Sequence, residues 1–138
     1  MRPAELWFYI DENIADGVHK TLASVYRVHR FRTPKDEGLT GGVKDIQLFH
    51  DLALRGFDAI ITMDGRQLEN QDERDALAAN NLHWIGFNMP TTRGADAIAR
   101  QSATILAGMP YVLDHWANKP TAYHLPDLPG TPPDIEPL

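Results

Sequence analysis

The feature that most constrains the fold is an apolar stretch near the start of the chain that stops at two carboxylates. Residues 6–10 (Leu-Trp-Phe-Tyr-Ile) are large and apolar without interruption, and Asp-Glu-Asn follows at residues 11–13. An apolar run without alternation is typical of a strand buried on both faces, as in a parallel sheet covered by helices. The pattern returns at residues 58–63, which lead to Asp64. Both strands would end in an acid, where open α/β sheets bind their ligands.

The rest of the chain alternates between helical and strand patterns. Helices are predicted over residues 14–24, 44–56, 71–80 and 94–117, and strands over residues 25–31, 58–63, 82–87 and 119–125. Asn13 is the expected cap of the first helix, and Pro110 is expected to kink the last helix or to split it in two. Strands that alternate with helices predict a three-layer α/β/α sandwich with a mainly parallel sheet.

Length and composition predict one folded domain and a tail. Residues 1–125 are expected to form the domain, and residues 126–138, with five prolines, an extended Pro-rich tail. The chain has no cysteine, which excludes disulfides, Cys-based zinc sites and thiol nucleophiles. The apolar run near the start is too short for a signal peptide or a membrane span, so we expect a soluble, cytoplasmic protein without a membrane partner.

The net charge of −6 is unevenly distributed along the sequence. Five cations and no acid lie between Gly17 and Asp36, namely Lys20, Arg27, Arg30, Arg32 and Lys35. Such a stretch can form a local phosphate-binding face on an otherwise acidic protein. Solvated charges beside a strand are an equally good interpretation of the stretch taken alone.

Three acids are candidates for a joint site, although each also has a purely structural explanation. Asp11 and Asp64 follow strands, and Asp45 lies at the start of a predicted helix, where the helix dipole favours an acid by roughly 0.3–1 kcal/mol. Several carboxylates in one crevice would repel one another, and a hard divalent cation such as Mg²⁺ removes that repulsion. Such a cation can orient a water and stabilise charge on a phosphodiester. The pattern alone does not bring Asp45, which follows a long loop, to the other two acids.

Three short motifs in this order resemble the PIN-like domain. They are Ile-Asp-Glu-Asn at residues 10–13, Gly-Val-Lys-Asp-Ile at residues 42–46 and Ile-Thr-Met-Asp at residues 61–64. The chain is most similar, over about residues 6–90, to the compact branch that includes the VapC-type toxins of type II toxin–antitoxin pairs. The resemblance implies an α/β/α sandwich with the first strand central, and cleavage of RNA that depends on Mg²⁺ or Mn²⁺.

The resemblance also assigns roles to residues and partners. It implies that Asp11, Asp45 and Asp64 are the catalytic, metal-binding acids, and that a cognate antitoxin holds the protein inactive. A second copy of the chain is a further candidate partner. We predict that RNA phosphates, or the acidic part of a partner protein, contact a set of four cations, Arg27, Arg30, Arg32 and Lys35.

The sequence departs from the family pattern in two places. Asp45 stands where many PIN domains have Glu. The further acid that often follows the third one is missing after Asp64, so Glu69 or Asp72 would have to replace it.

Two alternatives therefore stay open. One is a PIN-like binding module that has lost catalytic activity. The other is a phospho-receiver domain, with paired acids at residues 11 and 12, Asp64 as the phosphate acceptor and Lys119-Pro120 after a late strand.

Overall fold

The computed structural model describes residues 1–39, 43–88, 92–126 and 133–137. In these ranges five strands form one sheet in the order β2-β1-β3-β4-β5, and all neighbouring strands are parallel. The strands are β1 (Trp7–Ile10), β2 (Arg30–Arg32), β3 (Ala59–Thr62), β4 (His83–Gly86) and β5 (Ala122–His124). The helices are α1 (Val18–Val25), α2 (Asp45–Leu54), α3 (Arg66–Glu69), α4 (Gln71–Ala79) and α5 (Gly94–Asp114).

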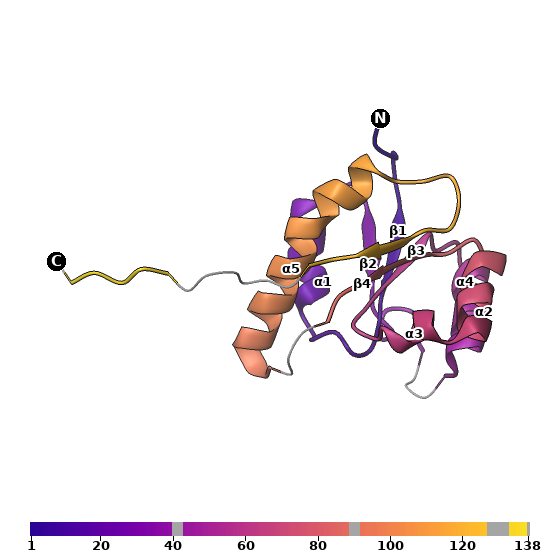
Figure 1. The fold of residues 1–138 in the computed structure, drawn as a ribbon, viewed down its shortest axis with the longest axis horizontal. Coiled ribbons are helices and arrows are strands. Elements are labelled where there is room, and N and C mark those ends of the chain that lie inside the picture. Colours follow the sequence, from indigo (N-terminus) through magenta and orange to yellow (C-terminus); the bar gives the residue numbers. More distant parts are fainter. Residues whose placement is uncertain (40–42, 89–91, 127–132, 138) are drawn as a thin grey trace.

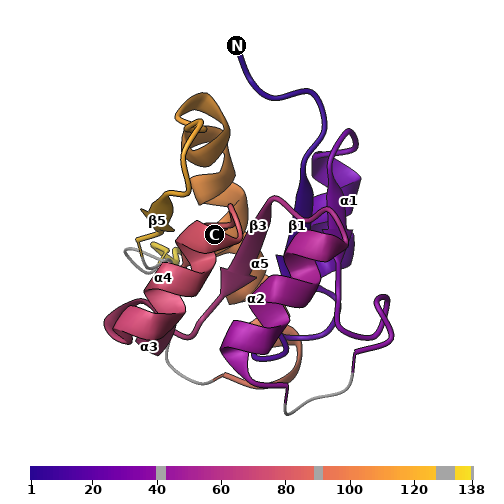
Figure 2. The same ribbon diagram turned by 90° about the vertical axis from the view of Figure 1, so that its right-hand side faces the viewer.

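Helices cover both faces of the sheet. Helices α1 and α5 lie on one side, and α2 and α4 on the other (Figure 1), where Figure 2 shows them side by side in front of the strands. Side chains alternate between these two layers along each strand, so Ile61 packs in the core beneath α1 and α5, whereas Ile60 packs in the core beneath α2 and α4. Both faces are buried, which explains the apolar runs without alternation. The predicted three-layer α/β/α sandwich is confirmed, here with an entirely parallel sheet.

The order of the strands creates one crevice at the carboxyl ends of β1 and β3. The connection through α1 leads from β1 to its neighbour β2, and the chain then returns past β1 to β3. Connections that leave neighbouring strands in opposite directions open a crevice between them, which is where doubly wound sheets bind ligands. The middle strand is β3, and β1 is interior but second from the edge, so the expectation of a central first strand is wrong.

The first helix and the second strand are both shorter than predicted. Helix α1 begins at Val18 after Gly17, whose φ of 99° lies in the left-handed region that glycine tolerates. Asn13 is therefore not the cap of this helix, because four residues separate it from the helix start. The alternating pattern over residues 25–31 misled the strand prediction, since α1 continues to Val25 and a turn precedes Arg30.

Pro110 does not divide the last helix, which is continuous from Gly94 to Asp114. A proline inside a helix costs about 3 kcal/mol. Ile105 and Met109 before Pro110 and Val112 after it are all buried in the core beneath this helix, and their packing offsets that cost. The two-helix alternative is therefore wrong.

Residues 133–137 are exposed and form no helix or strand, while most of the predicted tail lies outside the described residues. Within the described ranges, no helix combines the length and hydrophobicity that crossing a bilayer requires.

Candidate active site

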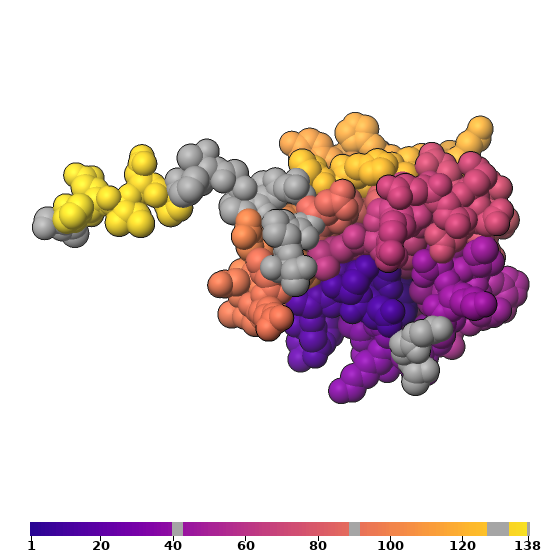
Figure 3. All heavy atoms as spheres, turned by 60° about the horizontal axis from the view of Figure 1, so that its bottom comes forward, coloured from indigo at the N-terminus to yellow at the C-terminus, as the bar shows by residue number. Residues whose placement is uncertain are grey.

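An open cleft of about 610 Å³ lies at the crevice between β1 and β3. It is lined by five carboxylates, Asp11, Glu12, Asp45, Asp64 and Glu69, with Asn13, Asn88 and a single cation, Arg66. In Figure 3, which brings the lower end of Figure 1 forward, the indigo residues after β1 lie between the purple and the pink parts of the chain. The three predicted acids therefore share one cleft, although they come from two strand ends and a helix start.

Asp11 is the most buried of these acids, with only 7% of its surface exposed. Its Oδ2 atom accepts a hydrogen bond of 2.7 Å from the hydroxyl of Thr62, and its Oδ1 atom accepts one of 2.8 Å from the backbone N–H of Glu12. Burial raises the pKa of Asp11, and the negative charges of Asp45 and Glu12 raise it further, while the two hydrogen bonds oppose the rise. The carboxylate is thus firmly held in an environment that disfavours its charge.

A buried glutamine links Asp11 to the indole ring of Trp84. Gln67 is 1% exposed, and its Nε2 atom lies 3.4 Å from Oδ2 of Asp11 as a hydrogen-bond donor. Its Oε1 atom accepts a hydrogen bond of 3.1 Å from Nε1 of Trp84. Because the indole can only donate, it fixes which end of the amide faces Asp11. The donor end therefore always faces the carboxylate, which favours the charged form of Asp11.

Thr62 and Asn13 tie the ends of β1 and β3 together. The Thr62 hydroxyl accepts hydrogen bonds from the backbone N–H of Asp64 (3.0 Å) and from the Asn13 side chain (3.2 Å) while it donates to Asp11. The carbonyl oxygen of the Asn13 side chain accepts from the backbone N–H of Met63 at 3.1 Å. Asn13 thus bridges two strand ends, which is why it is unavailable as a helix cap.

Asp64 is partly neutralised by its neighbour Arg66. The Nε atom of Arg66 lies 3.2 Å from Oδ1 of Asp64, which also accepts the backbone N–H of Arg66 at 3.1 Å. The Arg66 side chain is 86% exposed, whereas that of Asp64 is 23% exposed. An exposed ion pair of this kind contributes little stability, typically about 0–1 kcal/mol, so separating Arg66 from Asp64 costs little free energy.

Glu73 is a further acid at this site that the sequence analysis missed. Its side chain shares a hydrogen bond with the carboxyl group of Asp45. Burial raises the pKa of Glu73 to about 7, and that hydrogen bond and the negative charges of Asp45 and Asp64 contribute to the rise. Of the two replacements proposed for the missing acid, Glu69 lines the cleft and Asp72 does not. A helical signal was present, because Glu73 lies one turn before the buried Leu77 and so shares its face of α4.

The chemistry of these donors fits a hard divalent cation, although the acids are spread along the cleft. Within the described parts of the chain, no three side chains of the types His, Asp and Glu come close enough together to hold a metal ion directly. Mg²⁺ does not require such a cluster, since it commonly keeps several waters and binds one or two carboxylates. Asp11, Asp45 and Asp64, with Glu73 beside them, are the residues that would hold it, because a cation there would remove the unfavourable charge interactions that help to raise the pKa values of Asp11 and Glu73.

Two of the four predicted phosphate-binding cations are already paired with acids. Arg30 pairs with Glu5 at 3.5 Å and Arg32 with Glu37 at 2.9 Å, and Arg27 is exposed in the turn before β2. Lys35 lines a hollow of about 340 Å³ that shares Asp11 and Glu12 with the acidic cleft.

The position of Lys119 argues against the phospho-receiver alternative, which requires this lysine directly after a late strand. Lys119-Pro120 precedes β5 instead of following it, so Lys119 lies at the amino end of that strand. In a parallel sheet this is the end opposite to Asp64.

Comparisons of the chain with protein-family models, with curated proteins and with solved structures give no match.

Proposed function

We propose that this chain is a PIN-like endoribonuclease that uses Mg²⁺ or Mn²⁺ to hydrolyse phosphodiester bonds of RNA. The observation that carries the proposal is the gathering of Asp11, Asp45 and Asp64 in one cleft at the crevice between β1 and β3. The order of the three sequence motifs that resemble PIN-like domains supports it independently.

The position of each residue in the cleft would determine its role. A divalent cation supplies positive charge for the phosphodiester and activates a water. Asp11, oriented by Thr62 and Gln67, presents a carboxylate whose direction is fixed before any ligand arrives. Such pre-organisation lowers the cost of arranging donors around a cation. Asp45, with Glu73 beside it, would supply further carboxylate oxygens for the cation.

The biological role follows from the same resemblance. We propose that the protein is the toxin of a type II toxin–antitoxin pair, with a cognate antitoxin as its partner. Expression of the chain alone should slow growth of the host, while the Asp11→Asn variant should not. Equal growth with both proteins, at equal expression, contradicts the toxin role.

A binding module without catalytic activity is the second candidate. Arg66 favours it, because this cation occupies a place in the cleft near which the family often has an acid, and it pairs with Asp64. Such a module would bind RNA or a protein in EDTA as well as in Mn²⁺, and Arg66→Asp would not create cleavage.

Titration calorimetry with Mn²⁺ and a cleavage assay with structured RNA test the proposal. We expect binding to the wild-type protein and cleavage in Mn²⁺ that stops in EDTA. Asp45→Asn should lose both, whereas Asp51→Asn, on the same helix but outside the cleft, should keep both. Absence of Mn²⁺ binding to the folded wild-type protein contradicts the proposed function.

A further inference from the structure

A second hollow adjoins the acidic cleft on the side of β4 and β5. It has a volume of about 490 Å³, within the range of pockets that hold small ligands. Gly65, Glu69 and Asn88 line both hollows, so the two are continuous along the carboxyl ends of the strands. A ligand held in the acidic cleft can therefore extend into this second hollow.

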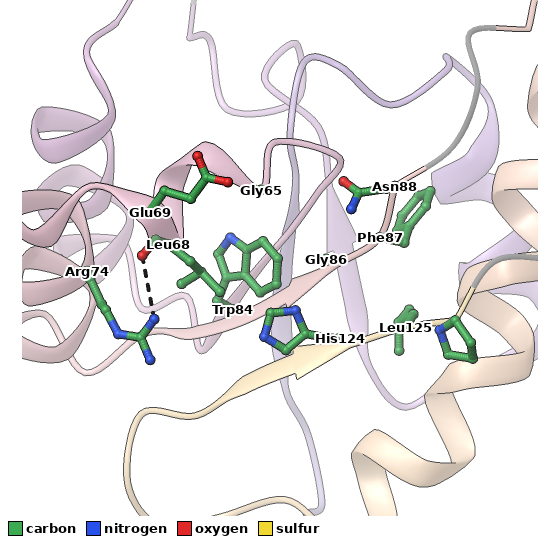
Figure 4. A pocket seen from close by; sticks show the side chains of 11 residues that line it. Gly65, Leu68, Glu69, Arg74, Trp84, Gly86, Phe87, Asn88, His124 and Leu125 are labelled. Carbon is green, nitrogen blue, oxygen red and sulfur yellow. Dashed lines mark hydrogen bonds between the residues drawn. The ribbon is translucent and has the colours of Figure 1, made fainter.

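Aromatic rings form one wall of the hollow. The indole of Trp84 lies close to the imidazole of His124, with ring centroids 5.1 Å apart and planes inclined by 54° (Figure 4). Trp84 is buried, and His124 is exposed. The solvent-facing ring is thus that of His124, and the indole supports it from below.

Gly86 leaves the space that the indole occupies. A Cβ atom at Gly86 would overlap Cη2 of Trp84, so the ring occupies the space that any side chain there would need. The hydrogen bond from Nε1 of Trp84 to Gln67 holds the ring from its other end. The missing side chain of Gly86 thus leaves room for the aromatic wall, and the hydrogen bond to Gln67 holds it.

The charge of the hollow differs from that of the cleft. The cleft has five carboxylates and one cation, whereas the second hollow has Glu69 as its one acid together with Arg74, His124 and the amide of Asn88. Leu68, Phe87 and Leu125 complete it as apolar walls. A rigid aromatic wall with an amide nearby suits a planar heterocycle that has hydrogen-bonding edges.

We propose that this hollow binds a nucleobase of the RNA next to the phosphodiester in the acidic cleft. The base stacks on the imidazole of His124, and its edge faces the side-chain amide of Asn88. Proteins that recognise unpaired RNA stack bases on aromatic side chains, including histidine, and form hydrogen bonds with the base edges. The inference rests on the proposed nuclease function, because that function places the phosphodiester in the neighbouring cleft.

Nucleotide titrations in EDTA test the base site separately from catalysis. The probes are the four ribonucleoside 5′-monophosphates, with ribose 5-phosphate as the control that lacks a base. The readout is the indole N–H resonance of Trp84 in protein labelled with ¹⁵N, assigned by its disappearance in Trp84→Phe. We expect at least one nucleotide to shift the Trp84 signal while those of Trp7 and Trp116 stay in place, and ribose 5-phosphate to have no effect.

Substitutions at the wall distinguish stacking from general binding. His124→Ala should weaken the nucleotide by at least about fivefold, since stacking on one aromatic ring is worth about 1–3 kcal/mol per base. His50→Ala removes an exposed histidine from α2 and should change nothing. In the cleavage assay, Asn88→Ala should alter the base preferred beside the cut.

Three outcomes overturn the base site. They are equal responses to ribose 5-phosphate and to the nucleotides, no response of Trp84 to any nucleotide, and unchanged affinity in His124→Ala. Each is measured without metal, so it leaves the nuclease proposal standing. Conversely, Mn²⁺ could fail to bind while a nucleotide still shifts the Trp84 signal. That result contradicts the proposed nuclease function and supports a nucleotide-binding hollow.

Discussion

The amino and carboxyl ends of the strands use the same kinds of polar side chain in different ways. At the amino ends, Oδ2 of Asp58 accepts the backbone N–H of Trp7 at 2.8 Å, and Nδ1 of His29 accepts that of Leu6 at 3.0 Å. Nδ1 of His83 likewise accepts the N–H of Thr121 at 3.2 Å. These side chains satisfy backbone donors that the sheet leaves without a partner.

At the carboxyl ends several acids lie close to one another. Asp45 shares its hydrogen bond with another carboxyl group, Glu73, and the pKa values of Asp11 and Glu73 are both raised. Native structures hold such unfavourable arrangements chiefly where function requires them. The comparison leads to the hypothesis that the position of an acid relative to its strand, more than its type, separates structural carboxylates from those of the proposed site. The substitutions below test that distinction.

The largest expected difference is in RNA cleavage. Asp64→Asn should reduce Mn²⁺-dependent cleavage by more than about 100-fold, because loss of even a side chain that orients a metal ligand costs about 10–100-fold. Asp58→Asn, at the amino end of the same strand, should retain cleavage. Comparable rates for Asp64→Asn and the wild type would remove Asp64 from the proposed site.

The next difference concerns the two buried glutamines. Gln67→Leu removes the donor that faces Asp11 and should weaken Mn²⁺ binding by about tenfold. Gln101→Leu removes an acceptor that serves the backbone N–H of Ala15. Neither residue lines the acidic cleft, so this change should destabilise the fold without changing the affinity for Mn²⁺. Calorimetry on both variants checks this, and equal affinities would mean that Gln67 is only a packing residue.

Stability should change in opposite directions at the two ends. Asp58→Ala leaves the partly buried N–H of Trp7 without its acceptor and should cost roughly 1–2 kcal/mol. Asp45→Asn relieves repulsion and should leave the metal-free protein equally or more stable. Urea unfolding in EDTA at pH 7.5 measures both. A loss of stability in Asp45→Asn similar to that in Asp58→Ala would contradict the comparison.

The pH dependence should also have opposite signs at the two ends. Glu73 has a pKa raised from 4.5 to about 7, so the folded state binds more protons than the unfolded state, and stability is lost as pH rises through this window. Burial lowers the pKa values of His29 and His83 below 6.5, so their contribution is lost as pH falls below that value.

Unfolding of the metal-free protein between pH 5 and 8 separates the two contributions. Glu73→Gln should remove the loss of stability toward pH 7 and leave the rise due to the histidines. Saturating Mn²⁺ should have a similar effect on the wild type, because the cation favours the charged carboxylate. A profile that is identical in Glu73→Gln and the wild type would exclude Glu73 from the crowded acids.

The smallest expected effect is in the salt dependence of RNA binding. Lys35→Ala should reduce the slope of log K against log[salt] by about one unit, as for one lost phosphate contact. Arg30→Ala should change it less, because Arg30 already pairs with Glu5. Equal slopes for Lys35→Ala and the wild type would favour a solvated side chain at this position.

The sequence patterns predicted those parts of the structure that depend on neighbours along the chain. The unbroken apolar runs identified β1 and β3, because a strand buried on both faces is apolar throughout. Helical periodicity identified α2, because a helix buried on one face repeats its apolar residues every three or four positions. Periodicity failed at residues 25–31, where His29 turns inward to accept the N–H of Leu6 instead of continuing a strand.

The site could be predicted only in part for a related reason. Asp11 and Asp64 follow from the strand ends, and Asp45 came only from the family resemblance. Gln67 follows a turn-like Asp-Gly pair and has no periodic signal, since its burial depends on hydrogen bonds to residues distant in sequence, Asp11 and Trp84. No pattern within a short window carries such information.

The register between β1 and β3 determines which residues lie opposite each other at the site. Ile10 lies opposite Ile61 in the sheet, so the next residue, Asp11, comes opposite Thr62, whose hydroxyl it requires. Deleting one residue from β1 would move the chain by about 3.3 Å and turn every following side chain to the other face. Insertions and deletions in evolution should therefore accumulate in the connections, and the lengths of these two short strands should be invariant wherever the cleft is in use.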